Sequence, residues 1–374
     1  MIRILHIARY ATVSIERRVV LMAAQPGFSF RLIRPRPVGG PFDAESIRDP
    51  NVFERVRHVR TWLADDPHRG IYGTLTFDIR RAAPDVIHAE EEPDSLAALH
   101  VSAARRVLRP RARLVINTWQ NVNRLKRPAV ARVLRRTLAA ADAITCGNAG
   151  AVAVLREQGY TGPAPVIPAL ALDAEIFHRR DVPRLDNAFT VGFVGRLAPE
   201  KGVDTLVRAI ARMGPPVRLV LAGDGPCRAA LAAQAQAEGV GDAVRFAGSL
   251  DPRQVAEFLS AIDVLVLPSR STPVWQEQFG RVLVEAMGCE TPVVGSDSGA
   301  IPAVVGDAGL VFPEDDVPAL VERLRRLRES PHLRLELGRR GSAWARTEHS
   351  PARRAGQMTD FYRQLVREPA RRIR

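Results

Sequence analysis

Short runs of apolar residues alternate along the chain with segments of helical periodicity. The runs are apolar at successive positions and often β-branched, which is typical of strands buried on both faces of a sheet. A first series comprises Ile2–Ala8, Phe28–Arg31, Val86–Ala89, Leu114–Thr118, Ala143–Cys146 and the shorter Val166–Ile167. A second series comprises Thr190–Val194, Val217–Ala222, Val244–Ala247, Val264–Pro268, Pro292–Gly295 and Leu310–Phe312. Amphipathic segments such as Leu206–Ala211, Cys227–Ala237 and Pro318–Glu329 separate the runs. This alternation predicts parallel sheets joined by right-handed helical crossovers.

The strand series occurs twice, and a stretch rich in proline lies between the two. We therefore predict an α/β protein with two Rossmann-like domains whose parallel sheets face each other across a cleft. The expected boundaries are residues 1–170 for the first domain, 171–187 for a linker and 188–350 for the second domain. Residues 351–374 are expected to form a helix that packs back on the first domain. A chain of 374 residues is also too long for one ordinary core.

Composition places the chain among soluble globular proteins, because 46% of its residues are hydrophobic and 25% are charged. No apolar run is long enough to span a bilayer. The first residues read as a buried strand rather than a signal peptide, so we expect a cytoplasmic protein. The three cysteines are odd in number and lack metal-ligand spacing, so we expect reduced thiols.

The net charge of +13 is concentrated in the first half of the chain. Residues 1–170 hold 26 Lys+Arg and 15 Asp+Glu, whereas residues 171–374 hold 28 and 26. Such an excess attracts anionic partners, and the Arg-rich run from Arg105 to Arg136 favours peripheral contact with the anionic inner face of a membrane. A compositional bias towards arginine is the alternative, since Lys126 and Lys201 are the only lysines. Aromatic residues make up 6% and no nucleic-acid motif occurs, so we expect no nucleic-acid partner.

The first stretch with chemistry follows the strand that ends near Gly195. Arg196 and Lys201 lie on the loop that leads into the next helix. Glycine allows a ligand to approach the backbone, and two cations before a helix N-terminus suit a diphosphate. Two further turns are weaker signals: the one containing Gly225, and the one at Ser249-Leu250, where the backbone could hydrogen-bond a planar base.

The segment from Glu277 to Glu285 is the strongest signal. Gly280 fits the start of a helix, which places Glu285 about one and a half turns inside it. A carboxylate there can accept two hydrogen bonds from a vicinal diol such as ribose, and its apolar neighbours require that it has a partner. Glu277 precedes the helix and can reach sugar hydroxyls. The free N–H groups of Phe279 and Gly280 can bind phosphate or a hydroxyl.

Two groups in the first domain are candidates for an acceptor site. Glu90, Glu91 and Glu92 follow a strand and could bind acceptor hydroxyls or an amine, or else form a charge cluster at a helix N-terminus. Gln120 and Asn121 follow the next strand. His88 is expected to be a core residue of its strand.

These motifs together resemble glycosyltransferase family 4, which has the two-domain GT-B fold. The resemblance rests on stretches that cover roughly the second domain in the family's order: Gly195-Arg196, Glu200-Lys201-Gly202, Ala222–Pro226, Arg245–Ser249, Asp263–Ser269, the Glu-x7-Glu element of Glu277–Glu285, Glu285–Val294 and Gly306–Leu310. The first domain matches less closely. Val13–Arg17 lacks the glycines that many members carry, and Thr118–Asn121 stands where many have a histidine.

The resemblance implies transfer of a hexosyl group from a UDP- or GDP-linked sugar to a hydroxyl acceptor. It implies retention of anomeric configuration, by front-face attack in which the leaving diphosphate takes the acceptor's proton. No metal and no other cofactor is expected. The acceptor is either a small soluble molecule or a lipid-linked one.

The resemblance also implies a role for each site residue of the second domain. Arg196 and Lys201 would bind the diphosphate, Glu277 the transferred sugar and Glu285 the ribose. The Phe279 and Gly280 backbone would approach sugar and phosphate, and Ser249-Leu250 the base.

A nucleotide-sugar epimerase on the same fold is the alternative that we keep. A pyridoxal enzyme is disfavoured, because one of the two lysines is already assigned to the phosphates.

Overall fold

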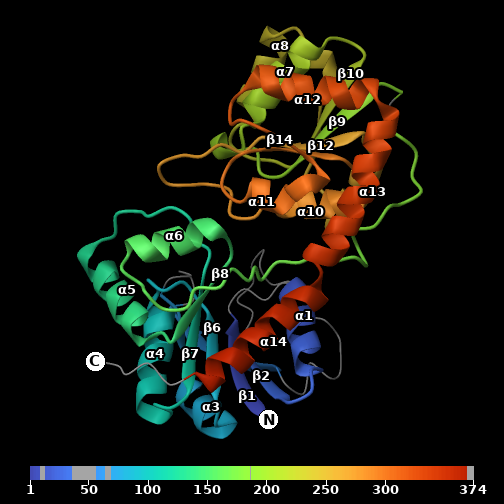
Figure 1. Ribbon diagram of the computed structural model, residues 1–374. Coiled ribbons are helices and arrows are strands. Elements are labelled where there is room, and N and C mark those ends of the chain that lie inside the picture. Colours follow the sequence, from blue (N-terminus) through green and yellow to red (C-terminus); the bar gives the residue numbers. More distant parts are fainter. Residues whose placement is uncertain (9–12, 36–55, 64–68, 186, 369–374) are drawn as a thin grey trace. The chain divides into compact units, whose positions relative to one another are not determined.

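The computed structural model describes residues 1–8, 13–35, 56–63, 69–185 and 187–368, with the side chains of residues 13–17 excepted. The chain divides into two compact units, one of Met1–Ala171 with Pro351–Arg374 and one of Leu172–Ser350. Both are α/β units built on a six-stranded sheet (Figure 1). Among the described residues, no helix is both long and apolar enough to cross a bilayer.

The first unit contains a parallel sheet of order β3-β2-β1-β6-β7-β8. Its strands are β1 (Ile2–Ala8), β2 (Phe28–Pro35), β3 (Val56–Val59), β6 (Val86–Glu90), β7 (Arg113–Thr118) and β8 (Ala143–Cys146), with a separate antiparallel pair β4 (Thr61–Trp62) and β5 (Ile71–Tyr72). Its helices are α1 (Val13–Ala23), α3 (Leu75–Ala82), α4 (Leu96–Leu108), α5 (Pro128–Ala140), α6 (Ala149–Glu157) and α14 (Pro351–Arg367). The predicted α/β class is confirmed.

The second unit repeats this topology with the order β11-β10-β9-β12-β13-β14. Its strands are β9 (Phe189–Val194), β10 (Val217–Ala222), β11 (Val244–Gly248), β12 (Val264–Leu267), β13 (Val293–Ser296) and β14 (Leu310–Phe312). Its α-helices are α7 (Val203–Met213), α8 (Arg228–Ala237), α9 (Pro252–Ala261), α10 (Arg281–Gly288), α11 (Ile301–Val305), α12 (Val317–Glu329) and α13 (Pro331–Glu348). The 3-10 turns are η1 (Pro199–Lys201), η2 (Gly241–Ala243) and η3 (Gly306–Ala308).

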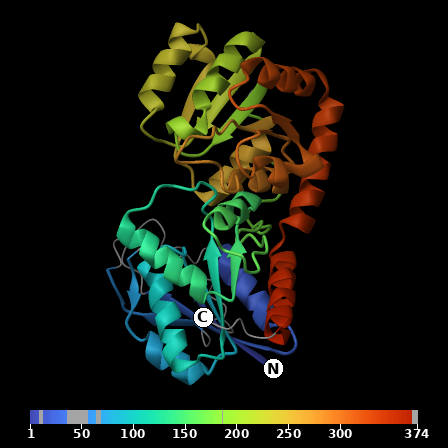
Figure 2. The same ribbon diagram turned by 60° about the vertical axis from the view of Figure 1, so that its left-hand side comes forward.

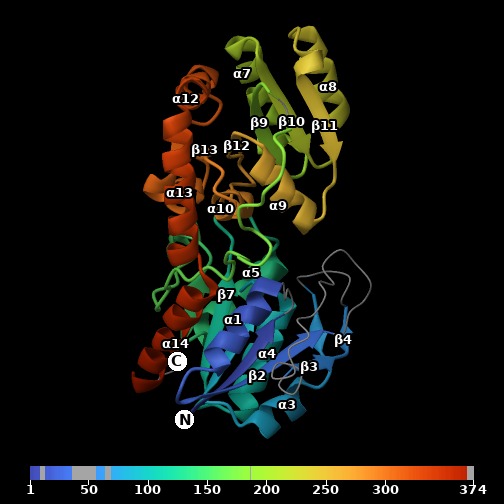
Figure 3. The same ribbon diagram turned by 90° about the vertical axis from the view of Figure 1, so that its right-hand side faces the viewer.

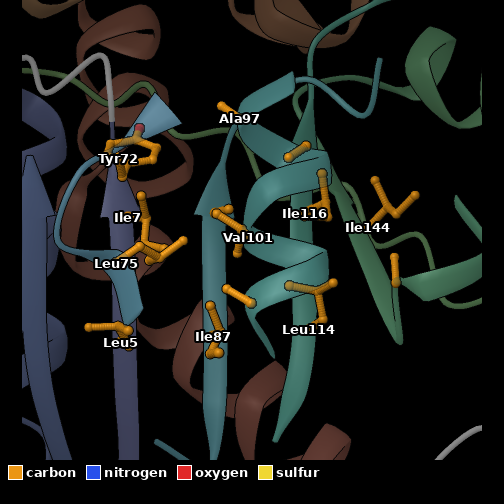
Figure 4. Packing of buried hydrophobic residues seen from close by; sticks show 14 of the residues in the cluster. Leu5, Ile7, Tyr72, Leu75, Ile87, Ala97, Val101, Leu114, Ile116 and Ile144 are labelled. Atoms are coloured by element: carbon orange, nitrogen blue, oxygen red, sulfur yellow. The ribbon is translucent and has the colours of Figure 1, made fainter. Parts of the chain in front are cut away.

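Alternation along the strands gives the first sheet two apolar faces. Residues on one face, such as Leu5, Ile87 and Ile116, join a buried cluster with α3, α4, α5 and α6 (Figure 4). Residues on the other face, such as Ile4, Val86 and Val115, pack instead on α1 and α14. Figure 2 shows α4 and α5 on one side of these strands and α14 on the other. Both faces are covered by helices, which is why the strands read as continuous apolar runs.

The C-terminal helix α14 belongs to the first unit and packs against α1 (Figure 3). Its Tyr362 lies 2.6 Å from Nδ1 of His88, and both side chains are fully buried. Burial lowers the pKa of His88 well below its usual value, so the ring is neutral at physiological pH. His88 therefore has a place in the strand core, where it ties a helix from the end of the chain to the sheet.

Two expectations from the sequence are corrected. Val166 makes an isolated parallel bridge to Cys146 rather than a strand. The Arg-rich run is not one surface, because Arg105 and Arg113 are buried and pair with Asp142 at 2.7 and 3.5 Å. A buried guanidinium requires a charge partner, so these two arginines hold α4, β7 and the start of β8 together.

A close backbone approach in the second unit fixes the loop after β9. Gly202 has φ +63, and a Cβ there would lie 2.0 Å from the carbonyl oxygen of Pro268, which directly follows β12. No side chain fits at this position. The contact holds the loop with Lys201 against the end of the neighbouring strand.

The substitution Gly202→Ala is therefore expected to lower the melting temperature by several degrees. It combines a left-handed backbone cost of roughly 1 kcal/mol with a clash against backbone. Gly239→Ala is the matched control, since Gly239 also has a positive φ (+72) but a Cβ there would have no neighbouring atom within 4 Å. Differential scanning fluorimetry that finds equal shifts for the two variants would contradict the steric argument.

Candidate active site

The candidate site of the second unit lies where its strand order reverses. β9 pairs with β10 on one side and with β12 on the other, so the connections after β9 and β12 leave the same edge of the sheet in opposite directions. This switch point is where ligands bind in open parallel sheets. Lys201 comes from the loop after β9, and Glu277 comes from the long loop after β12.

Lys201 and Glu277 form an ion pair of 2.6 Å between Nζ and Oε2. The buried hydroxyl of Ser269 donates to the same carboxylate oxygen at 3.0 Å. The side chains retain 20% and 11% of their accessible surface, so the pair is largely shielded from water yet reachable by a ligand. The two residues predicted to bind the diphosphate and the sugar are therefore brought together. Ser269 was not predicted as a site residue, because its hydroxyl follows the strand without a spacing signal.

An aromatic side chain also contacts Lys201. Its Nζ lies 4.5 Å from the ring centroid of Trp275, a cation–π distance. The loop that bears Trp275 is held at its base by Ser271, whose N–H and hydroxyl both donate to the Glu314 carboxylate at 2.5 Å. The sequence interpretation missed Trp275, although a tryptophan two residues before Glu277 was a visible signal.

Glu285 projects from α10, and its side chain is 13% exposed. Burial raises the pKa of its carboxyl, Asp173 raises it further, and Arg281 opposes the shift. The Arg281 guanidinium lies 3.0 Å from the Glu285 carboxylate, one turn earlier on the helix. An acid among apolar neighbours thus has a cationic partner, as the sequence pattern required, but the partner was not predicted.

The residues between the two glutamates shape the start of α10. Gly280 caps the helix with φ +74, a left-handed conformation that favours glycine. Phe279 is buried and packs edge-on against His349 at 5.6 Å between ring centroids. Its side chain therefore anchors the segment that leads into α10 within the second unit.

The other predicted donor residues lie around the same sheet edge but make fewer contacts. Arg196 is exposed. Gly195 and Gly225 lie in tightly packed turns, since a Cβ on Gly225 would be 2.4 Å from the carbonyl oxygen of Leu197. Ser249 and Leu250 follow β11, which is separated from β9 by β10, and Ser249 is exposed.

The predicted acceptor residues of the first unit lie after β6 and β7. Glu90 is 8% exposed, pairs with Arg18 of α1, and lies 3.2 Å from Nε2 of His6. Although burial alone would raise the pKa of Glu90, Arg18 and His6 hold it well below its usual value. Glu91 is also buried and accepts a hydrogen bond from the Tyr72 hydroxyl. Both carboxylates are engaged within the unit.

Glu92 has a different environment. It accepts hydrogen bonds from the Thr118 hydroxyl at 2.7 Å and from the Trp119 N–H at 2.8 Å. Burial nevertheless raises the pKa of Glu92 to about 7. A carboxyl group with a pKa near neutrality at the end of a strand is a common feature of functional sites.

Gln120 lies beside this carboxyl and is oriented by a charged neighbour. Its side-chain amide donates to both oxygens of Asp94 at 3.0 and 3.1 Å, and Asp94 also accepts from Lys126 at 2.5 Å. Asn121 packs close to Gly150 at the start of α6. Asp94 and Lys126 were not predicted to be part of this group, because nothing in their spacing links them.

The sequence of the second unit matches a known family. Residues 175–344 match glycosyl transferases group 1. The match covers most of the second unit, Leu172–Ser350. The chain is similar to alpha-D-kanosaminyltransferase from Streptomyces kanamyceticus, with 30% identity over 48% of this chain and 47% of that protein. It is also similar to D-inositol 3-phosphate glycosyltransferase from Actinosynnema mirum, with 33% identity over 50% and 49%.

The fold matches that of solved structures over its whole length. HepE of Anabaena, solved in complex with UDP and glucose, aligns with a TM-score of 0.71 and 19% identity, covering 97% of this chain and 100% of that one. The two-domain GT-B fold expected from the motifs is thereby confirmed, and the match of the second unit to glycosyl transferases group 1 supports the resemblance. The chain spans about half the length of the two curated relatives named above. Neither of these relatives is named as an epimerase, so the alternative of a nucleotide-sugar epimerase gains no support.

We expect the Glu92 carboxyl to titrate near pH 7, because burial outweighs its two hydrogen bonds. Carbon-13 NMR of side-chain carboxyl groups, with Glu92→Gln to assign the signal, measures this directly. The raised pKa has a consequence for stability. The folded chain binds this proton more tightly than the unfolded chain, so the group costs stability above about pH 7 and this cost disappears as the pH falls towards the usual value of a glutamate. Titration of all glutamate signals below about pH 5.5 would contradict the assignment.

Proposed function

We propose that the chain is a retaining glycosyltransferase of family 4 that moves a hexosyl group from a UDP- or GDP-linked sugar to a hydroxyl acceptor without a metal. The observation that carries the proposal is the Lys201–Glu277 pair at the β9/β12 switch point. It combines a cation for the leaving diphosphate and a carboxylate for sugar hydroxyls within one hydrogen bond of each other. HepE, whose fold is similar, was solved in complex with UDP and glucose, which supports a nucleotide-sugar donor for this chain.

In the proposed reaction the bond between the anomeric carbon and the diphosphate breaks while a bond to the acceptor oxygen forms on the same face. Lys201 stabilises the charge that develops on the leaving diphosphate, and a partly desolvated cation is effective in this role. The acceptor's proton moves to the leaving phosphate oxygen. Glu277, held by Ser269, fixes the sugar through its hydroxyls, and Glu285 accepts hydrogen bonds from the ribose.

A diphosphate can bind Lys201 without breaking its pair with Glu277. In the structure Glu277 neutralises Lys201, and a diphosphate brings additional negative charge to the same ammonium group. Lysine has three donors and can bind Glu277 and a phosphate oxygen together. The cation is therefore poised for the diphosphate without being left unpaired before the donor arrives.

A panel of UDP- and GDP-sugars tests the donor half of the proposal. A true donor at 100 times its Kd is expected to stabilise the chain by about 2.7 kcal/mol, which thermal shift can detect, and to be hydrolysed slowly without acceptor.

Lys201→Ala is expected to lower turnover by about a hundredfold or more, because it removes the cation that stabilises the leaving diphosphate. Arg323→Ala, which removes a cation far along the chain on α12, is the control. Normal turnover of Lys201→Ala would refute the site.

For the acceptor we propose a small polar molecule whose hydroxyl or amine groups contact the cluster of Glu92, Asp94 and Gln120. Membrane contact is the other hypothesis. Its basis is now a smaller surface of exposed residues, Arg124, Arg127, Arg132, Arg135 and Arg136, with the fully exposed Leu125 beside them.

Glu92→Gln is expected to raise the acceptor KM several-fold while leaving the donor KM unchanged, since it alters only the first unit. Glu91→Gln and the exposed control Glu157→Gln test neighbouring and unrelated carboxylates. Unchanged acceptor kinetics in both Glu91→Gln and Glu92→Gln would exclude this acceptor site.

Co-sedimentation of the protein with vesicles of acidic phospholipid tests the membrane hypothesis. Binding by the wild type that is lost in the double variant Arg132→Ala/Arg135→Ala would instead favour a membrane-borne acceptor.

A further inference from the structure

The ion pair within α10 is arranged against the usual rule for helix stability. Arg281 occupies the first position of the eight-residue helix, and Glu285 lies in its last turn. A helix favours acids at its N-terminus and bases at its C-terminus, and an i,i+4 pair stabilises a helix better when the acid comes first. The order here is reversed, so helix stability does not explain the pair.

The two partners also differ in exposure. The Glu285 side chain is 13% exposed, whereas that of Arg281 is 63% exposed. The carboxylate is thus fixed in a shielded position, and the guanidinium reaches it from the solvent side. Two charged groups act on Glu285 from different elements, Arg281 on its own helix and Asp173 near the start of the second unit, while the thiol of Cys289 lies one turn further on.

Ribose recognition depends on the charge state of this carboxyl. An ionised carboxylate can accept hydrogen bonds from both hydroxyls of a vicinal diol. A protonated carboxyl carries an O–H group, which needs an acceptor of its own. Burial and Asp173 both favour the protonated form, and Arg281 opposes them. Removing Arg281 would therefore leave a buried acid beside another acid.

We propose that Arg281 is a positioning residue for the donor, which holds the Glu285 carboxylate ionised and oriented towards the ribose hydroxyls. The inference rests on the proposed function and assigns a role to a residue that lies between the two glutamates. Each glutamate of the segment then has its own cation: Lys201 pairs with Glu277, and Arg281 pairs with Glu285.

A double-mutant cycle on nucleotide affinity tests the proposal. The dissociation constants of UDP and GDP are measured by calorimetry for the wild type, Arg281→Ala, Glu285→Gln and the double variant. Arg281→Ala is expected to weaken binding of the preferred nucleotide about tenfold, a typical loss for one charge-assisted contact. In the Glu285→Gln background the same change is expected to alter affinity less than about twofold, because Arg281 acts through Glu285.

Discrimination between ribose and deoxyribose gives a readout that a purely structural role would not move. The wild type is expected to prefer UDP or GDP to its 2′-deoxy form, and Arg281→Ala to lose most of this preference, while Arg281→Lys keeps part of it. The loss is expected to grow as the pH falls, since without Arg281 the Glu285 carboxyl binds its proton more readily. Arg340→Ala is the matched control, because Arg340 and Glu336 also form an exposed i,i+4 pair in the same unit.

The possible outcomes distinguish a failure of the proposed function from a failure of the role of Arg281 alone. If the wild type binds neither UDP nor GDP, the proposed function fails and this inference fails with it. If the wild type binds but Arg281→Ala binds equally well, the positioning role alone is wrong. If Arg281→Ala weakens binding equally in the wild-type and Glu285→Gln backgrounds, Arg281 contacts the diphosphate directly and the proposed role through Glu285 is overturned.

Discussion

The pairing of Lys201 with Glu277 is the interaction on which the second unit's site depends. It joins the loops after β9 and β12, the two strands at which the sheet reverses its order. A shielded ammonium group without a carboxylate would be costly, and a shielded carboxylate without a cation equally so. The pair therefore places a cation and a carboxylate side by side at a position where water is partly excluded, an arrangement suited to the proposed diphosphate and sugar.

Backbone geometry makes this pairing possible. Gly202 lets the loop after β9 touch the carbonyl of Pro268, and Gly299, where a Cβ would be 2.2 Å from the carbonyl oxygen of Glu277, lets the segment after β13 touch the loop after β12. Three strand connections thus meet through backbone contacts at which no side chain fits. The Lys201 ammonium and the Glu277 carboxylate therefore interact at positions that these backbone contacts have already fixed.

Most strands and the start of α10 could be predicted from the sequence because both follow local patterns. Apolar runs mark strands buried on two faces, and Glu277 and Glu285 sit at a spacing that a helix start explains. The partners could not be predicted in the same way. Arg105 and Asp142 are 37 residues apart, and only the folded sheet brings them to 2.7 Å. Arg281 lies close in sequence, yet its order relative to Glu285 is opposite to the one that helix rules favour.

The three consecutive glutamates at the end of β6 illustrate why residue type alone does not determine an acceptor site. Glu90 is held ionised by Arg18, Glu91 is bound to Tyr72, and Glu92 has a pKa of about 7. Their backbone positions differ by one residue each, but their environments give one structural ion pair, one structural hydrogen bond and one group that can change its charge near neutral pH. Since only Glu92 has a pKa near neutrality, the environment of each carboxylate rather than the number of acidic residues decides which glutamate is the candidate for the proposed acceptor site.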